Sequence, residues 1–132
     1  DLSQYISNLT IHLLNIYRTD PKKVDLKIEI GDVYLDINTA IPCGLIINEL
    51  VSNSLKYAFP GKRRGTILIK LDIDKRGKYV LNISDNGVGL PEDLNIENTD
   101  TLGFQLVNDL TKQIQGKLTM TRKPGTAFKI VF

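Results

Sequence analysis

Residues 48–58 read Asn-Glu-Leu-Val-Ser-Asn-Ser-Leu-Lys-Tyr-Ala, and they belong to the stretch that decides the fold. Small or apolar side chains recur at intervals of three and four over residues 43–58. This period predicts a helix that buries one face against a core. Asn38 or Thr39 is the expected N-cap, and Pro60-Gly61 is expected to end the helix.

The same helix carries a polar face beside its apolar one. Glu49, Asn53 and Lys56 lie at positions i, i+4 and i+7, with Tyr57 next to them. A solvated polar face is one interpretation. A metal and phosphate site is the other, because an Asn oxygen suits Mg²⁺, a Lys ammonium neutralises phosphate and a carboxylate can orient or deprotonate a nucleophile. The helix alone leaves both interpretations open.

Outward from this helix, the periodicity predicts two further helices and about six strands. The mixture of hairpins and helices predicts an α+β fold: a two-layer sandwich with three helices on one face of a mixed, mostly antiparallel sheet. Before the central helix, we expect a helix from 2 to 17, capped by Ser3 and closed by Asp20-Pro21, and then strands 26–30 and 33–37. After it, we expect a hairpin of strands 66–74 and 79–83 and a loop over 91–101. The chain then forms a helix over 102–114 with Gly116 as C-cap, and a hairpin of strands 118–120 and 128–132 around Lys123-Pro124-Gly125.

Three glycine-containing stretches lie further along the chain, at the end of a predicted strand, at the start of the last predicted helix and at the start of the last predicted strand. Asp85-x-Gly87-x-Gly89 ends a predicted strand, and an ionised Asp there accepts hydrogen bonds, for example from an exocyclic amine. Gly103 stands at a helix start, where free backbone N–H groups suit a phosphate. Gly125-Thr126 opens the last strand. Taken singly, each stretch is more typical of an ordinary turn or helix end.

Composition excludes several classes of function. The 132 residues predict a single domain over 1–132, and a net charge of +2 argues against nucleic-acid binding. One cysteine, Cys43, and one histidine, His12, exclude a disulfide framework and a His/Cys zinc site. Cys43 is expected to pack in the core, and the lack of disulfides predicts a cytoplasmic location. No apolar run reaches the ~18 residues of a membrane span. Because the chain opens on Asp1 rather than Met, we expect a longer parent protein.

Read together and in order, these motifs resemble the ATP-binding fold shared by histidine kinases, gyrase, the chaperone Hsp90 and the mismatch-repair protein MutL, the Bergerat-type fold. Residues 48–58 look like the family's N box, Asp85-x-Gly87-x-Gly89 like its first glycine box, residues 102–107 like the second, and residues 125–128 like the last Gly-Thr motif. The likeness is strongest to sensor histidine kinases with a shortened lid, which residues 91–101 would form.

At the phosphate end of the site, the resemblance implies a role for each matching residue. Asn53 would be the Mg²⁺ ligand, Asn48 would line the phosphate side, and Lys56 would reach phosphate as a catalytic cation. Glu49 would be the base or the group that orients the acceptor. Leu102, Gly103 and Phe104 would bring backbone N–H groups to the phosphates.

At the base end, the resemblance places Asp85 as the acceptor from the adenine amino group. Thr126 would support the adenine directly or through water, and Tyr57 would pack near the base. Gly87 and Gly89 would shape the pocket floor and the lid hinge. The cofactors implied are ATP and Mg²⁺.

The function implied is donation of the ATP γ-phosphate to a histidine on a separate dimerisation and phosphoacceptor domain of the same kinase. A response-regulator receiver domain would be the next partner; we expect no nucleic acid and no membrane contact by this domain. His12 lacks the setting of a phosphoacceptor and is interpreted as a surface residue of the first helix.

Two departures from the family pattern concern the lid. It holds no Lys or Arg, which leaves Lys62, Arg63 or Arg64 as further cations for phosphate, and it shows no phenylalanine-bearing lid motif. Two alternatives stay open: a gyrase-like or MutL-like ATPase in which Glu49 activates water, and a degenerate module that binds a partner without catalysis.

Overall fold

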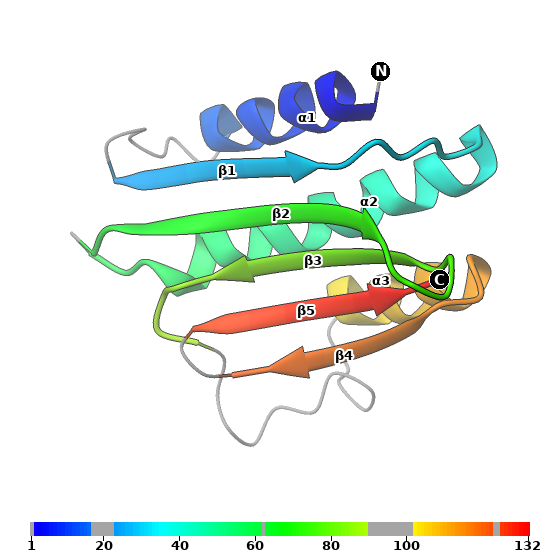
Figure 1. Cartoon of the computed structure of the whole chain (residues 1–132). Coiled ribbons are helices and arrows are strands. Elements are labelled where there is room, and N and C mark those ends of the chain that lie inside the picture. The colour runs from blue at the N-terminus through cyan, green and yellow to red at the C-terminus, as the bar shows by residue number, and fades with distance from the viewer. Residues whose placement is uncertain (1, 17–22, 62, 90–101, 123–124) are drawn as a thin grey trace.

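The computed structural model describes residues 2–16, 23–61, 63–89, 102–122 and 125–132. Within them, a five-stranded sheet has the strand order β1-β2-β3-β5-β4, and three helices pack side by side on one of its faces (Figure 1). β1 runs parallel to β2, and every other pair is antiparallel. The predicted α+β two-layer architecture is therefore confirmed. The elements are α1 (Leu2–Ile16), β1 (Val24–Ile30), α2 (Ile37–Asn53), η1 (Ser54–Ala58), β2 (Gly65–Ile73), β3 (Tyr79–Asp85), α3 (Leu102–Gln113), β4 (Lys117–Thr121) and β5 (Thr126–Val131).

The three central strands build one continuous apolar layer. Side chains alternate between the two faces of a strand, so every second residue of β2, β3 and β5 faces the helices. In the register, Ile83 stands between Ile69 of β2 and Phe128 of β5, and all three are buried. Burying side chains of this size contributes about 1.5–3 kcal/mol each. This layer fixes the strand ends from which the site is built.

α2 is the central helix of the second layer. Its residues Ile46, Ile47, Leu50 and Val51 have no exposed surface, as the apolar period predicts. Cys43 is 2% exposed in the same helix, which confirms its interpretation as a core residue. α1 and α3 pack on either side of α2.

The strand predicted over residues 33–37 is not formed. The chain leaves β1 through Gly31, whose N–H donates to Leu71 O at 2.9 Å, and then turns tightly where Val33 N–H donates to Gly31 O. The half-buried Val33 and Leu35 alternate as in a strand, but no strand pairs with them in the described part of the chain. Alternation without a partner strand therefore produced a wrong prediction.

The start of α2 also differs from the prediction. The N-cap is Asp36, whose Oδ1 accepts from the N–H of Asn38 at 2.6 Å, rather than Asn38 or Thr39. An extended backbone at Asp36 lets its carboxylate reach a free N–H of the first turn. Pro42 then falls inside the helix, near its start.

The end of the helix holds a feature that periodicity did not predict. The α-helix stops at Asn53, and residues Ser54–Ala58 form a single wider π-helical turn, η1. The Ser54 N–H donates to both Leu50 O and Val51 O at this junction. Such turns occur mostly as short insertions and frequently at functional sites.

Two predicted caps are wrong. Ser3 lies within α1, which begins at Leu2. At the end of α3, the residue with the left-handed backbone is Gln115 (φ +58°), not Gly116. Gly116 N–H donates to Thr111 O at 2.8 Å, which closes a Schellman motif. A Cβ at Gly116 would approach Ile130 to 3.1 Å, so a close approach to β5 favours glycine there.

Some predictions fall outside the described residues: the helix end at Tyr17 with Asp20-Pro21, Lys62, the loop 91–101, and the turn residues 123–124. In the part of the chain that the structure describes, no helix is both long and apolar enough to cross a membrane. The single-domain boundary at 1–132 stays a prediction.

Candidate functional site

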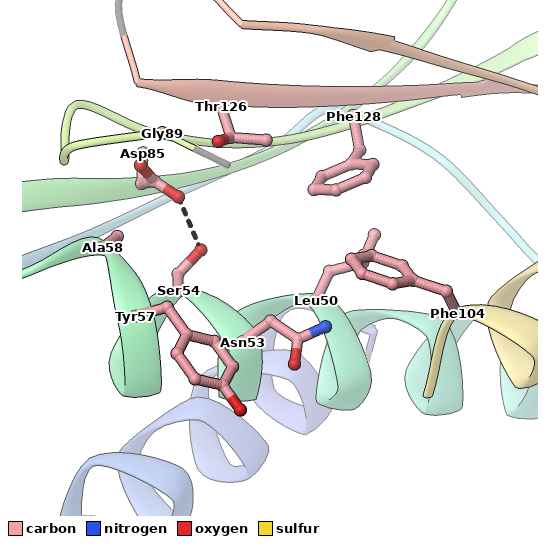
Figure 2. Close-up of a pocket in the computed structure, with 10 residues that line it drawn as sticks. All are labelled: Leu50, Asn53, Ser54, Tyr57, Ala58, Asp85, Gly89, Phe104, Thr126 and Phe128. Atoms are coloured by element: carbon pink, nitrogen blue, oxygen red, sulfur yellow. Dashed lines mark hydrogen bonds between the residues drawn. The ribbon is translucent and has the colours of Figure 1, made fainter. Parts of the chain in front are cut away.

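A pocket opens where the end of α2 and the turn η1 face the ends of β3 and β5 and the first turn of α3 (Figure 2). All four sequence motifs contribute to it, although they are far apart in the chain. Its lining residues are Leu50, Asn53, Ser54, Tyr57, Ala58, Asp85, Gly89, Phe104, Thr126 and Phe128.

Asp85 is the charged group at the base of this pocket. It is the last residue of β3, and its side chain is 8% exposed. One carboxylate oxygen, Oδ2, accepts from the Ser54 hydroxyl at 2.8 Å, and the other accepts from the Gly87 N–H at 3.0 Å. A buried carboxylate requires such donors, because they replace the water that solvates it outside. Asp85 is thus fixed in orientation with acceptor capacity to spare.

The glycines around Asp85 are explained by close backbone approach. A Cβ at Gly87 would overlap the carbonyl of Ala58, which accepts from Val88 N–H at 2.9 Å. Gly125 has φ +68°, and a Cβ there would overlap the backbone carbonyl of Asp85. Glycine is the residue that accepts both constraints without strain.

Thr126 lies directly opposite Asp85 in the antiparallel pairing of β3 and β5. It is 4% exposed and lines the pocket on the side of the strands, as Figure 2 shows. Gly89, with φ +80°, brings the loop after β3 to the same end. The structure thus brings these three residues together at one end of the pocket.

The opposite wall is aromatic. Phe104 of α3 and Phe128 of β5 are both buried, with ring centroids 6.1 Å apart and an angle of 35° between the rings. Leu50 lies beside them along α2 (Figure 2). The result is a pocket with one charged end and one apolar wall, the usual composition of a small-molecule site.

The polar residues of α2 and η1 divide into two groups. Asn53 and Tyr57 line the pocket, and Tyr57 is 63% exposed. The half-buried Asn48 and Glu49 lie one turn or more before Asn53 and do not line it, and Lys56 is exposed. The face predicted from spacing exists, but the pocket takes up only its last part.

Glu49 does meet another predicted site residue. A Cβ built on Gly103 would lie 2.9 Å from Glu49 Oε2, so the first turn of α3 rests against this carboxylate. Gly103 leaves room for it. Leu102, by contrast, is 80% exposed and points away from the core. The second glycine motif is therefore adjacent to the N box.

Sequence reasoning missed four pocket residues. Leu50, Ala58 and Phe128 lie within the predicted motifs, but no role in the site was assigned to them. Ser54 was placed on the small-or-apolar face, and its bond to Asp85 joins residues 31 positions apart. A serine among the apolar positions of a buried helix face was the signal that could have found it, because a buried hydroxyl needs a partner.

Comparison with known proteins agrees with this geometry. Residues 38–132 match the family model described as histidine kinase-, DNA gyrase B- and HSP90-like ATPase. This chain belongs to that family. The recognition of a histidine-kinase-type ATP-binding domain from the sequence motifs is thereby confirmed.

The curated proteins that this chain resembles include sensor histidine kinases. The chain is 35% identical over 115 residues to the sensor histidine kinase PdtaS of Mycobacterium tuberculosis, covering 81% of the chain and 23% of the relative. It is 26% identical over 121 residues to blue-light-activated histidine kinase 2 of Erythrobacter litoralis, covering 92% of the chain and 34% of the relative. The chain thus spans about a third or less of these relatives.

The fold is shared with solved histidine kinases. A histidine kinase domain from the Erythrobacter litoralis blue-light activated histidine kinase superposes with a TM-score of 0.89 at 23% identity, covering 99% of this chain and 60% of that one. The mycobacterial sensor histidine kinase MprB gives a TM-score of 0.68 at 21% identity, with coverage of 96% and 93%. These likenesses show the fold.

Proposed function

We propose that this chain binds Mg-ATP and presents the γ-phosphate to a histidine on a separate dimerisation and phosphoacceptor domain of the same kinase. One observation supports this most directly. The buried Asp85 carboxylate is held by two donors at the base of a pocket that Asn53 also lines. Membership of an ATPase family and the sensor-kinase relatives support the same function.

At the base end, Asp85 accepts a hydrogen bond from the adenine amino group. Its two oxygens each accept one bond within the protein, and a carboxylate oxygen has room for a second. Thr126, opposite Asp85 in the sheet, supports the same end directly or through water. Tyr57 packs at the open side, where its exposed ring covers the base.

At the phosphate end, Asn53 is the protein ligand for Mg²⁺. The donor set fits this ion: an amide oxygen is a hard ligand, and Mg²⁺ takes most of its remaining ligands from phosphate and water. Among the described residues no three His, Cys, Asp or Glu side chains form a cluster that could hold a metal. Asn48 and Lys56 line the route of the phosphates, and backbone N–H groups of Leu102, Gly103 and Phe104 approach them at the start of α3.

In this reaction, the main role of the protein is to position charged groups around the phosphates of ATP. Phosphoryl transfer needs alignment of the donor and acceptor and stabilisation of the equatorial oxygens, with little covalent chemistry by side chains. Lys56 supplies a positive charge, with Arg63 or Arg64 as further cations. Glu49, whose carboxylate lies against the first turn of α3, orients the incoming acceptor or takes its proton.

The acceptor lies outside this chain. His12, its one histidine, is exposed on α1, an element that contributes nothing to the pocket. The partners in this proposal are the phosphoacceptor domain and, after it, a response-regulator receiver domain. A cytoplasmic location, without nucleic-acid or membrane contact by this domain, belongs to the same proposal.

The test is transfer of labelled γ-phosphate from ATP to an added phosphoacceptor domain. We expect transfer with the unaltered chain, loss of at least tenfold in rate for Asn53→Ala, and no change for Asn82→Ala, a matched substitution on β3. Unchanged transfer by Asn53→Ala would contradict the metal role. Rapid ATP hydrolysis that Glu49→Gln abolishes would favour the gyrase-like or MutL-like ATPase, and absence of nucleotide binding would favour the non-catalytic module.

A further inference from the structure

Ser54 differs from the other polar residues of the pocket because its hydroxyl is buried and donates a hydrogen bond within the protein. It is 7% exposed, and its Oγ donates to Asp85 Oδ2 at 2.8 Å in a bond that is itself buried (Figure 2). The bond links the first residue of the π-helical turn η1 to the last residue of β3. Together with the bond from Val88 N–H to Ala58 O, it ties the N box to the first glycine motif.

We propose that Ser54 is a positioning residue that makes the site select purines with a 6-amino group over purines with a 6-oxo group. This rests on the proposed function, in which Asp85 receives the base. The hydroxyl has a single proton, and Asp85 takes it, so Ser54 Oγ presents only lone pairs to the pocket. The ionised carboxylate also presents only acceptors.

The two side chains therefore form an acceptor-only end of the pocket. A 6-amino group offers two N–H donors to it. A 6-oxo group would instead place a third hydrogen-bond acceptor against the acceptor oxygens of Asp85 and Ser54. The oxo oxygen would find no donor in these two side chains, and the unpaired polar atoms would weaken binding. Because the Gly87 N–H holds the other carboxylate oxygen, Asp85 cannot readily rotate to relieve the conflict.

Local structure explains why the hydroxyl reaches Asp85. η1 begins at Ser54, and the wider turn changes the direction in which side chains leave the helix after Asn53. Ala58, at the end of the same turn, accepts from the Val88 N–H beside Asp85. Both ends of η1 are thus bonded to the segment that carries the carboxylate.

The test compares binding of ADP and IDP, two diphosphates that differ in the 6-substituent of the base, by calorimetric titration with Mg²⁺. We expect the unaltered chain to prefer ADP. Ser54→Ala should weaken ADP binding about tenfold and change IDP binding by less than twofold, so that the preference shrinks about tenfold. Ser54→Thr, which keeps the hydroxyl, should retain most of the preference.

Ser52→Ala is the matched control, since Ser52 is 6% exposed in the same helix but does not line the pocket. It should leave the ADP/IDP ratio unchanged. If Ser54→Ala does not fold, Ser54→Cys, of similar size and with a weak donor, takes its place. Equal weakening of both nucleotides, or an unchanged ratio, would overturn the specificity role. Failure of the unaltered chain to bind either nucleotide would instead overturn the proposed function, and this inference with it.

Discussion

Gly125 and Gly77 both have a left-handed backbone, with φ +68° and +79°, but their surroundings differ. A Cβ at Gly77 would meet nothing within 4 Å, whereas a Cβ at Gly125 would overlap the backbone of Asp85. Alanine substitutions at these two glycines therefore separate the effect of backbone strain on stability from the effect of a steric overlap.

Gly77→Ala should therefore lower the free energy of unfolding by about 1–2 kcal/mol, the amount expected for left-handed strain alone. Gly125→Ala should lower it by more, because the turn must also move away from Asp85, and nucleotide affinity should fall with it. Urea denaturation of both variants measures the difference. Equal losses in stability would show that the approach of Gly125 to Asp85 is not tight in solution.

Cys43 gives a prediction on pH. Burial raises the pKa of its thiol from the ordinary value of 9.0 to about 12, because the thiolate is poorly solvated in the core. The native state then keeps the proton in a pH range where the unfolded chain loses it. The stabilisation is present below pH 9 and is lost as the pH rises from about 9 toward 12.

Unfolding measured by denaturant at pH 8 and pH 10 should show this loss in the unaltered chain and a smaller one in Cys43→Ala. The comparison with the variant separates the contribution of Cys43 from that of the other ionisable side chains. In the native chain, iodoacetamide should modify Cys43 at pH 8 only at the rate of unfolding. Fast modification at that pH would contradict its burial.

At the scale of elements, α3 ends on a Schellman motif in which a non-glycine residue takes the left-handed position. Gln115 has φ +58°, and the motif is closed by Gly116 N–H donating to Thr111 O. Replacing Gln115 with glycine removes the strain of its Cβ at this position.

Gln115→Gly should therefore raise the free energy of unfolding by about 0.5–1 kcal/mol, since part of the strain relieved is offset by the greater freedom of glycine in the unfolded chain. Thermal unfolding followed by circular dichroism measures the change. Lys112→Gly, inside the same helix, is the control and should lower stability by about 1 kcal/mol. Destabilisation by Gln115→Gly would contradict the assigned helix end.

The elements that periodicity predicted are those buried against a partner. The face of α2 that contains Ile46 and Leu50 repeats at helical spacing because it is buried in the core. Residues 33–37 show the alternation of apolar and polar side chains that is typical of a strand. No neighbouring strand pairs with them, so a strand does not form there. η1 was not predictable, because its five residues continue the helical spacing and only their hydrogen bonds differ.

At the scale of the whole molecule, the candidate site is assembled from segments that meet only through the sheet order. Asp85, Gly89 and Thr126 were predictable because each belongs to a motif of a known family. Ser54 was not, because its role depends on the end of α2 reaching the end of β3, a contact across 31 positions. The order β2-β3-β5 then brings Thr126 to the same place.

In the proposed function, this pocket binds an adenine nucleotide through Asp85. Calorimetric titration with a non-hydrolysable ATP analogue, with and without Mg²⁺, measures this binding. We expect saturable binding that Mg²⁺ strengthens, at least a tenfold loss of affinity in Asp85→Asn, and no loss in Asp72→Asn, whose side chain is half exposed beside Lys70. No binding at millimolar nucleotide, or equal affinity in Asp85→Asn, would contradict the role of Asp85 in binding adenine.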